Sequence, residues 1–139
     1  MSSGFSKAEQ EAMKQRAEEL RAERGGKKKA DWLESLLEAI EAISENDRAI
    51  AVMVHQVVSE VAPELSPRTW YGFPAYERDG KVIVFYQPAS KFDVRYGTLG
   101  FQEGAALDDG NMWATSYAIN QVTDEVTERV RELVKRAIR

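Results

Sequence analysis

The stretch PRTWYGFPAYERDGKVIVFYQ, residues 67–87, decides the fold of this chain. Aromatic and β-branched side chains dominate it in an alternating pattern that is typical of β-strands. We expect strands at about Thr69–Glu77 and Lys81–Gln87. The residues between them, Arg78-Asp79-Gly80, favour a hairpin turn, because glycine adopts a positive φ without steric cost. The sequence therefore predicts an antiparallel sheet built outward from this hairpin.

The alternating pattern of aromatic and β-branched residues continues toward the C-terminus. Further strands are expected at about Phe92–Leu99 and Met112–Asn120, with a turn at 87–90, where Pro88 has no amide to give to a ladder. The connection between these strands is irregular, with a helical turn expected at Glu103–Leu107. After the last strand, an apolar stripe at helical spacing follows Thr123, which suits a helix cap.

Two helices are expected before the hairpin. Apolar residues recur there at helical spacing, and the pattern is interrupted once, at Ser44-Glu45-Asn46-Asp47. Helices followed by a run of strands and a closing helix indicate an α+β domain. We expect N-terminal helices, an antiparallel sheet of about four to five strands covered by helices on one face, and a C-terminal helix.

The first 29 residues differ from the rest. Ser6-Lys7-Ala8-Glu9 is a capping box, so a helix is expected from there to about Arg24, where Gly25-Gly26 ends it. This helix has few apolar positions and buries little surface, so we expect a loosely docked or mobile arm. The chain accordingly divides into residues 1–29, a charged helical arm and linker, and residues 30–139, the α+β domain.

Composition excludes several chemistries. The chain has 139 residues, no cysteine and a formal net charge of −4. The absence of cysteine excludes disulfides, zinc–thiolate sites and thiol nucleophiles. The single histidine, His55, lies in a predicted helix without partners for a catalytic triad, and no glycine loop suits phosphate binding. We therefore expect a non-enzymatic protein of the cytoplasm, as a monomer or weak dimer, with no membrane partner.

Residues 69–76, TWYGFPAY, followed by Gly80-Lys81, resemble the YdhG-like family of bacterial domains of unknown function. That family belongs to the YjbR/CyaY-like superfamily, which includes frataxin. The resemblance covers about residues 30–139 and implies a frataxin-like fold. It departs from the family pattern at Phe73, where methionine is common, and at residues 123–125, where a proline often opens the last helix. Members of the superfamily have been linked to iron delivery, so the resemblance implies an iron-donor role and an iron-acceptor protein as partner.

Surface carboxylates are the candidate iron ligands, because iron accepts carboxylate oxygens and weak sites can be built from exposed acids. Asp108 and Asp109 form the densest acidic pair, and Glu103 and Asp79 are the other candidates. The alternative interpretation is that these acids belong to ordinary loops and turns, since their spacing is not diagnostic of a metal site.

The aromatic residues suggest a different site. They are concentrated in the predicted strands, and helices on one face of a sheet leave some of them on the open face. With nearby basic residues they form a candidate surface for an anion or a protein partner: Trp70, Tyr76, Tyr96, Arg95, Lys91 and Trp113. The alternative is core packing together with ordinary surface tyrosines.

Three functional hypotheses follow. The first is a non-enzymatic accessory protein that binds or donates iron. The second is a small protein- or anion-binding module that uses the open sheet face. The third and weakest is nucleic-acid binding through Lys27-Lys28-Lys29, because the rest of the chain is acidic.

Overall fold

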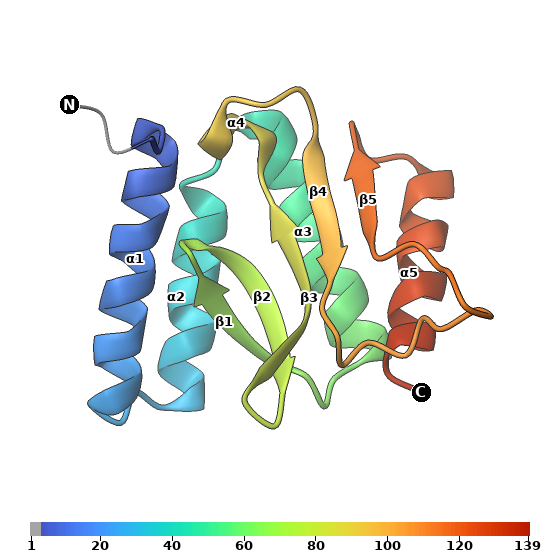
Figure 1. Cartoon of the computed structure of the whole chain (residues 1–139), viewed down its shortest axis with the longest axis horizontal. Coiled ribbons are helices and arrows are strands. Elements are labelled where there is room, and N and C mark those ends of the chain that lie inside the picture. The colour runs from blue at the N-terminus through green and yellow to red at the C-terminus, as the bar shows by residue number, and fades with distance from the viewer. Residues whose placement is uncertain (1–3) are drawn as a thin grey trace.

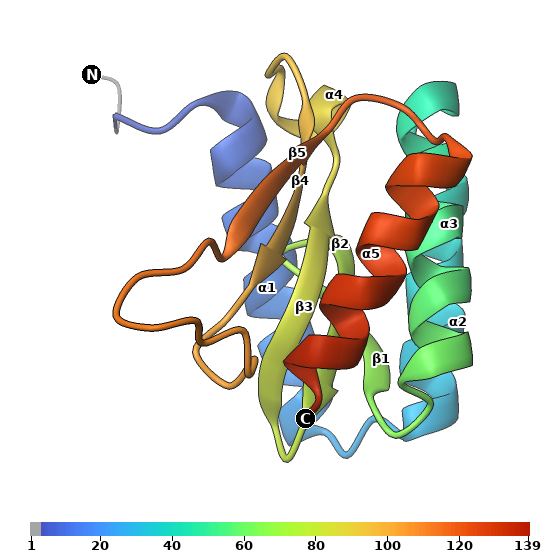
Figure 2. The same cartoon turned by 90° about the vertical axis from the view of Figure 1, so that its right-hand side faces the viewer.

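The computed structural model describes residues 4–139 and shows an α+β domain. Five strands form one antiparallel sheet in the order β1-β2-β3-β4-β5. Helices α2, α3 and α5 cover one face of the sheet, while α1 lies on the other side, along the β1 edge (Figures 1 and 2). The elements are α1 Lys7–Arg24, α2 Lys29–Glu41, α3 Glu45–Val61, β1 Ser66–Trp70, β2 Phe73–Arg78, β3 Lys81–Gln87, α4 Ala89–Phe92, β4 Gly97–Phe101, β5 Ser116–Ile119 and α5 Asp124–Ala137.

The core lies between the sheet and the three helices on its covered face. It is made of aliphatic side chains at helical spacing on the helices and at alternate positions on the strands. The fully buried members include Leu36, Ile50, Val54, Val58, Val84, Leu99 and Val134. The predicted fold class is therefore confirmed, including the helical covering of one face.

The helix ends follow the expected capping chemistry. Ser6 Oγ accepts a hydrogen bond from the Glu9 amide at 3.1 Å, and the Ser6 amide donates to Glu9 Oε1 at 3.0 Å. Thr123 Oγ1 accepts from the Val126 amide at 3.1 Å and caps α5. These bonds satisfy amides that have no partner within the helix.

One strand prediction is wrong in a way that matters for the site. The expected strand Thr69–Glu77 is two strands, β1 and β2, joined by a two-residue turn at Tyr71-Gly72. Both turn residues have positive φ, 53° for Tyr71 and 83° for Gly72. Such a turn matches the twist of a tight hairpin. It places Trp70 opposite Phe73 in the register, so the alternation of faces restarts at the turn.

Other boundaries also differ from expectation. The N-terminal half of the expected strand Phe92–Leu99 is irregular, because the short helix α4 follows Pro88 and ends at Asp93 with a φ of 52°. Strand β4 is therefore limited to Gly97–Phe101. The expected helical turn at Glu103–Leu107 is absent; that segment is an irregular loop, and the Ala106 amide donates to the Ala137 carbonyl at 2.9 Å.

Removal of the hydroxyl group is expected to have opposite effects on stability at two buried tyrosines of the core. The Tyr86 hydroxyl has no hydrogen-bond partner within residues 4–139, and burial raises the pKa of Tyr86. Tyr76 is equally buried, but its hydroxyl lies 2.9 Å from His55 Nδ1 in a hydrogen bond. Burial lowers the pKa of His55, so this imidazole favours its neutral form.

We therefore expect Tyr86→Phe to raise the free energy of unfolding by about 1 kcal/mol, because it removes an unsatisfied buried hydroxyl. We expect Tyr76→Phe to lower the free energy of unfolding by about 1 kcal/mol, because it removes a hydrogen bond. Urea denaturation of both variants measures the difference. A loss of stability in both would show that Tyr86 has a partner.

Candidate functional site

The candidate site lies where α1 meets the turn between β1 and β2. Glu19 of α1 is buried, although glutamate is seldom buried without partners. Its two carboxylate oxygens accept hydrogen bonds from the backbone amides of Tyr71 and Gly72, each at 3.0 Å. Hydrogen bonds to an ionised acceptor are stronger than neutral ones, so this contact fixes α1 against the hairpin.

The turn has the geometry of a small anion-binding site. The two successive amides of this turn point to the same side and donate to one carboxylate, as backbone amides in anion-binding turns do. Position 72 favours glycine because its φ of 83° strains other residues, and an added Cβ would also displace the end of the Gln15 side chain. The turn is therefore shaped for close approach of α1.

Arg16 Nη1 of α1 donates to Glu19 Oε1 at 3.4 Å, and further polar contacts join α1 to the domain one turn before and one turn after Glu19. Lys91 Nζ of α4 donates to Gln15 Oε1 at 2.7 Å, and Arg68 Nη2 donates to the Glu23 carboxylate at 3.4 Å. In both of these contacts with the domain, the donor lies on the domain and the acceptor lies on α1. The α1-binding surface of the domain thus presents hydrogen-bond donors and positive charge.

Charge and burial oppose each other at Lys91. Burial lowers the pKa of Lys91, whereas the carboxylates of Glu11 and Glu19 raise it. Because both acids belong to α1, docking of α1 supplies negative charge where the domain holds a partly buried ammonium group.

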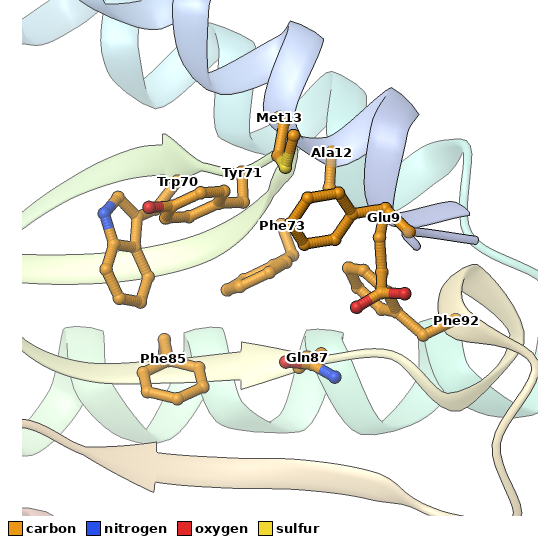
Figure 3. A pocket seen from close by; sticks show the side chains of 10 residues that line it. Glu9, Ala12, Met13, Trp70, Tyr71, Phe73, Phe85, Gln87 and Phe92 are labelled. Atoms are coloured by element: carbon orange, nitrogen blue, oxygen red, sulfur yellow. The ribbon is translucent and has the colours of Figure 1, made fainter. Parts of the chain in front are cut away.

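An aromatic patch adjoins the turn, on the side of the sheet that faces α1 (Figure 3). We define it as Trp70, Tyr71, Phe73, Phe85 and Phe92. Trp70 and Phe85 have ring centroids 5.3 Å apart, Phe73 and Phe85 5.7 Å, and Phe73 and Phe92 6.1 Å. These separations are in the range of favourable aromatic pairs.

A cavity of about 310 Å³ separates the aromatic patch from α1. The patch forms its floor, and Phe5, Glu9, Ala12 and Met13 line its other side (Figure 3). Ala12 is the buried apolar residue of α1, while the Met13 side chain remains 44% exposed. The volume falls at the low end of small-ligand pockets, and its walls are predominantly apolar.

The structure distributes the predicted binding residues over several places. Trp70 belongs to the aromatic patch, and Lys91 lies beside the Tyr71-Gly72 turn. Tyr96 and Arg95 lie together on the segment between α4 and β4, where the Arg95 guanidinium is 5.2 Å from the Tyr96 ring centroid. Trp113 is on the loop between β4 and β5 and is 40% exposed.

The assignment of Tyr76 to the open face is wrong. Its side chain is 1% exposed and contacts His55 on the helix-covered side. The prediction placed Trp70 and Tyr76 on one face by continuous alternation. The Tyr71-Gly72 turn breaks that alternation, because Trp70 pairs with Phe73 and Tyr76 is three residues further on, on the opposite face.

The candidate iron ligands are exposed. Asp79 is in the turn between β2 and β3, and Glu103, Asp108 and Asp109 are on the loop between β4 and β5. Glu103 lines a pocket together with Gly80 and Lys81, next to Asp79. No group of three or more histidine or acidic residues suited to a metal ion occurs within the described part of the chain, residues 4–139. The iron hypothesis stays a prediction; an anaerobic Fe(II) titration followed by NMR, with Asp108→Asn and Asp109→Asn variants, tests it.

Lys27 of the basic segment contacts the domain. Its Nζ donates to Ser35 Oγ at 2.6 Å and lies 4.2 Å from the Trp32 ring centroid. Lys28 and Lys29 are exposed, so the predicted nucleic-acid contact rests on those two side chains.

Sequence reasoning missed Glu19, Gln15 and the turn amides. A signal was present: Tyr71-Gly72 separates two aromatic residues, as a two-residue hairpin loop with glycine does. Glu19 could not be singled out among the acidic residues of α1, because its burial depends on where α1 docks.

No protein-family model, curated protein or solved structure matches this chain. Within residues 4–139, no helix has both the length and the apolar character needed to cross a membrane.

Proposed function

We propose that this chain is a non-enzymatic binding module that recognises a protein partner through the aromatic patch and the adjoining Tyr71-Gly72 turn. The observation that carries the proposal is the combination of a buried carboxylate on two turn amides with an aromatic cavity beside it. Aromatic side chains provide rigid apolar contact area, and backbone amides orient an acidic group. The chemistry suits a partner that carries an apolar side chain near a carboxylate.

The resemblance of residues 69–76 to the YdhG-like family supports an accessory role rather than a catalytic one. It does so at the residues that build the site, because Trp70 to Phe73 form the turn and the centre of the aromatic patch. The cysteine-free composition is compatible with a cytoplasmic location, which we include in the proposal.

The proposal is tested with 8-anilinonaphthalene-1-sulfonate, a dye that joins aromatic rings to an anionic group. We expect saturable one-to-one binding to the native chain at neutral pH. Shifts in the NMR amide signals should concentrate on Trp70, Tyr71, Gly72 and Phe85. Trp70→Ala should weaken dye binding by about tenfold, which corresponds to the loss of one large aromatic contact.

Trp113→Ala is the matched control, because Trp113 is a partly exposed tryptophan outside the patch. We expect it to leave dye binding unchanged. Equal losses from Trp70→Ala and Trp113→Ala, or amide shifts confined to other surfaces, would contradict the proposal. Far-UV circular dichroism confirms that each variant remains folded.

A further inference from the structure

The contacts between α1 and the domain resemble those between a helical ligand and a receptor surface. The acceptors come from one face of the helix, at Gln15, Glu19 and Glu23, spaced four residues apart. Residues at this spacing lie on the same face of an α-helix. The donors come from two parts of the domain, α4 and the β1–β2 hairpin, and Arg68 also pairs with Glu77 of β2 at 2.9 Å.

The packing of α1 is incomplete. Its apolar side chains bury little surface, since Met13 is 44% and Leu20 is 39% exposed. Ala12 is the buried apolar side chain of α1 beside the cavity of about 310 Å³ above the aromatic patch, and Phe5, Glu9 and Met13 line the rest of that side. A helix with a larger apolar residue at this position would fill space that α1 leaves empty.

The connection between α1 and α2 is short. It contains Gly25-Gly26, and Gly26 has a φ of 81°, a conformation that glycine adopts readily. The Lys27 amide donates to the Ala22 carbonyl at 3.1 Å and closes the end of α1. A short linker gives α1 a high local concentration, so α1 competes effectively with a ligand that arrives from solution. Such a ligand must bind the surface more tightly than α1 does, or bind it while α1 is released.

On the basis of the proposed function, we propose that the surface under α1 is a receptor for a helix of a protein partner that carries hydrogen-bond acceptors, including a carboxylate, along one face, and that α1 occupies it in the free chain. The partner helix places a carboxylate on the Tyr71 and Gly72 amides and a bulky apolar side chain two turns earlier, in the cavity. Charge complementarity supports this occupant, because Lys91 and Arg68 flank the line of acceptors.

The test uses the full chain and a fluorescein-labelled peptide of residues 6–24, acetylated and amidated at its ends, as the probe. The full-chain variant Glu19→Ala weakens docking of its own α1. We expect it to bind the wild-type peptide at least about tenfold more tightly than the wild-type chain does, because intramolecular competition is reduced. Fluorescence anisotropy measures both dissociation constants.

Peptide variants test the chemistry of recognition against the Glu19→Ala chain. A Glu19→Gln peptide should bind at least about tenfold more weakly than a Glu18→Gln peptide. Glu18 is the matched control, because it is the neighbouring glutamate and is exposed. An Ala12→Leu peptide should bind about fivefold more tightly than the wild-type peptide, since leucine fills the cavity.

Equal affinities of the Glu19→Gln and Glu18→Gln peptides would overturn the proposal, as would the absence of peptide binding. If the dye binds at the aromatic patch and the peptide does not bind, the proposed function stands and the helix receptor is rejected. Displacement of the peptide by free glutamate at the same concentration as the peptide would assign the turn to small anions instead. The surface would instead be assigned to a second copy of the chain if the wild-type chain were a stable dimer with exchanged α1 helices. Analytical ultracentrifugation detects the dimer, and a disulfide cross-link engineered across the α1 contact detects the exchange.

Discussion

Replacement of Glu19 with alanine is expected to release α1 from the sheet while the rest of the domain remains folded. The substitution leaves the Tyr71 and Gly72 amides without the acceptors that hold them at 3.0 Å. An unsatisfied amide in a partly buried position costs about 1–3 kcal/mol, so the docked state becomes less favourable by about 2 kcal/mol. The loss of about 2 kcal/mol cannot exceed the free energy with which α1 docks, because release of α1 exposes both amides to water.

Two measurements detect the release. Hydrogen exchange at the Tyr71 and Gly72 amides should accelerate by about 30-fold, the factor that corresponds to about 2 kcal/mol. Limited proteolysis should cut near Gly25-Gly26 sooner than in the wild-type chain. Glu18→Ala is the control, and a surface substitution of this kind changes stability by no more than about 0.5 kcal/mol. Similar behaviour of the two variants would contradict the role assigned to Glu19.

Replacement of Gly100 with alanine is expected to be a strongly destabilising single-methyl addition to the sheet. Gly100 of β4 pairs with Phe85 of β3, and a Cβ at this position would overlap the Phe85 ring. Phe85 cannot move freely, because it contacts Trp70 and Phe73 in the aromatic patch. Overpacking of this kind costs about 1–3 kcal/mol, and we expect the free energy of unfolding to fall by about 3 kcal/mol.

The same substitution should reduce dye binding, because Phe85 forms the floor of the cavity. Gly104→Ala is the control: its added Cβ meets a single atom, Ile83 Cδ1, at 2.9 Å, so a much smaller displacement relieves the overlap than at Gly100. A double variant, Gly100→Ala with Phe85→Leu, should recover part of the lost stability, since coupled neighbours are not additive. Urea denaturation of the wild-type chain, Gly100→Ala, Phe85→Leu and the double variant gives the four free energies of unfolding that this comparison needs. Additive losses in the double variant would show that Phe85 and Gly100 do not interact.

Sequence reasoning reached the fold because the elements are defined by local patterns. The capping box at Ser6 and Glu9, the cap at Thr123 and the strand at Lys81–Gln87 each depend on a few neighbouring residues. The hairpin at Tyr71-Gly72 was missed because periodicity treats aromatic residues as strand residues, even where a glycine with positive φ turns the chain. That one error also placed Tyr76 on the wrong face.

The candidate site was only partly accessible to sequence reasoning. Trp70 and Lys91 could be predicted because aromatic and basic residues are common components of binding surfaces. Glu19 was not, since a helix with eighteen residues and many charges gives no sign of which carboxylate becomes buried. Its burial arises from a contact between residues more than fifty positions apart, and no local pattern encodes that contact.

The most direct test of the account compares the Tyr71 and Gly72 amide resonances in the wild-type chain, in Glu19→Gln and in Glu18→Gln. A carboxylate that accepts both amides deshields their protons, and an amide side chain is a weaker acceptor. We expect both resonances to move upfield in Glu19→Gln and to remain unchanged in Glu18→Gln. Unchanged resonances in Glu19→Gln would mean that the turn does not bind this carboxylate, and the recognition site proposed here would lose its basis.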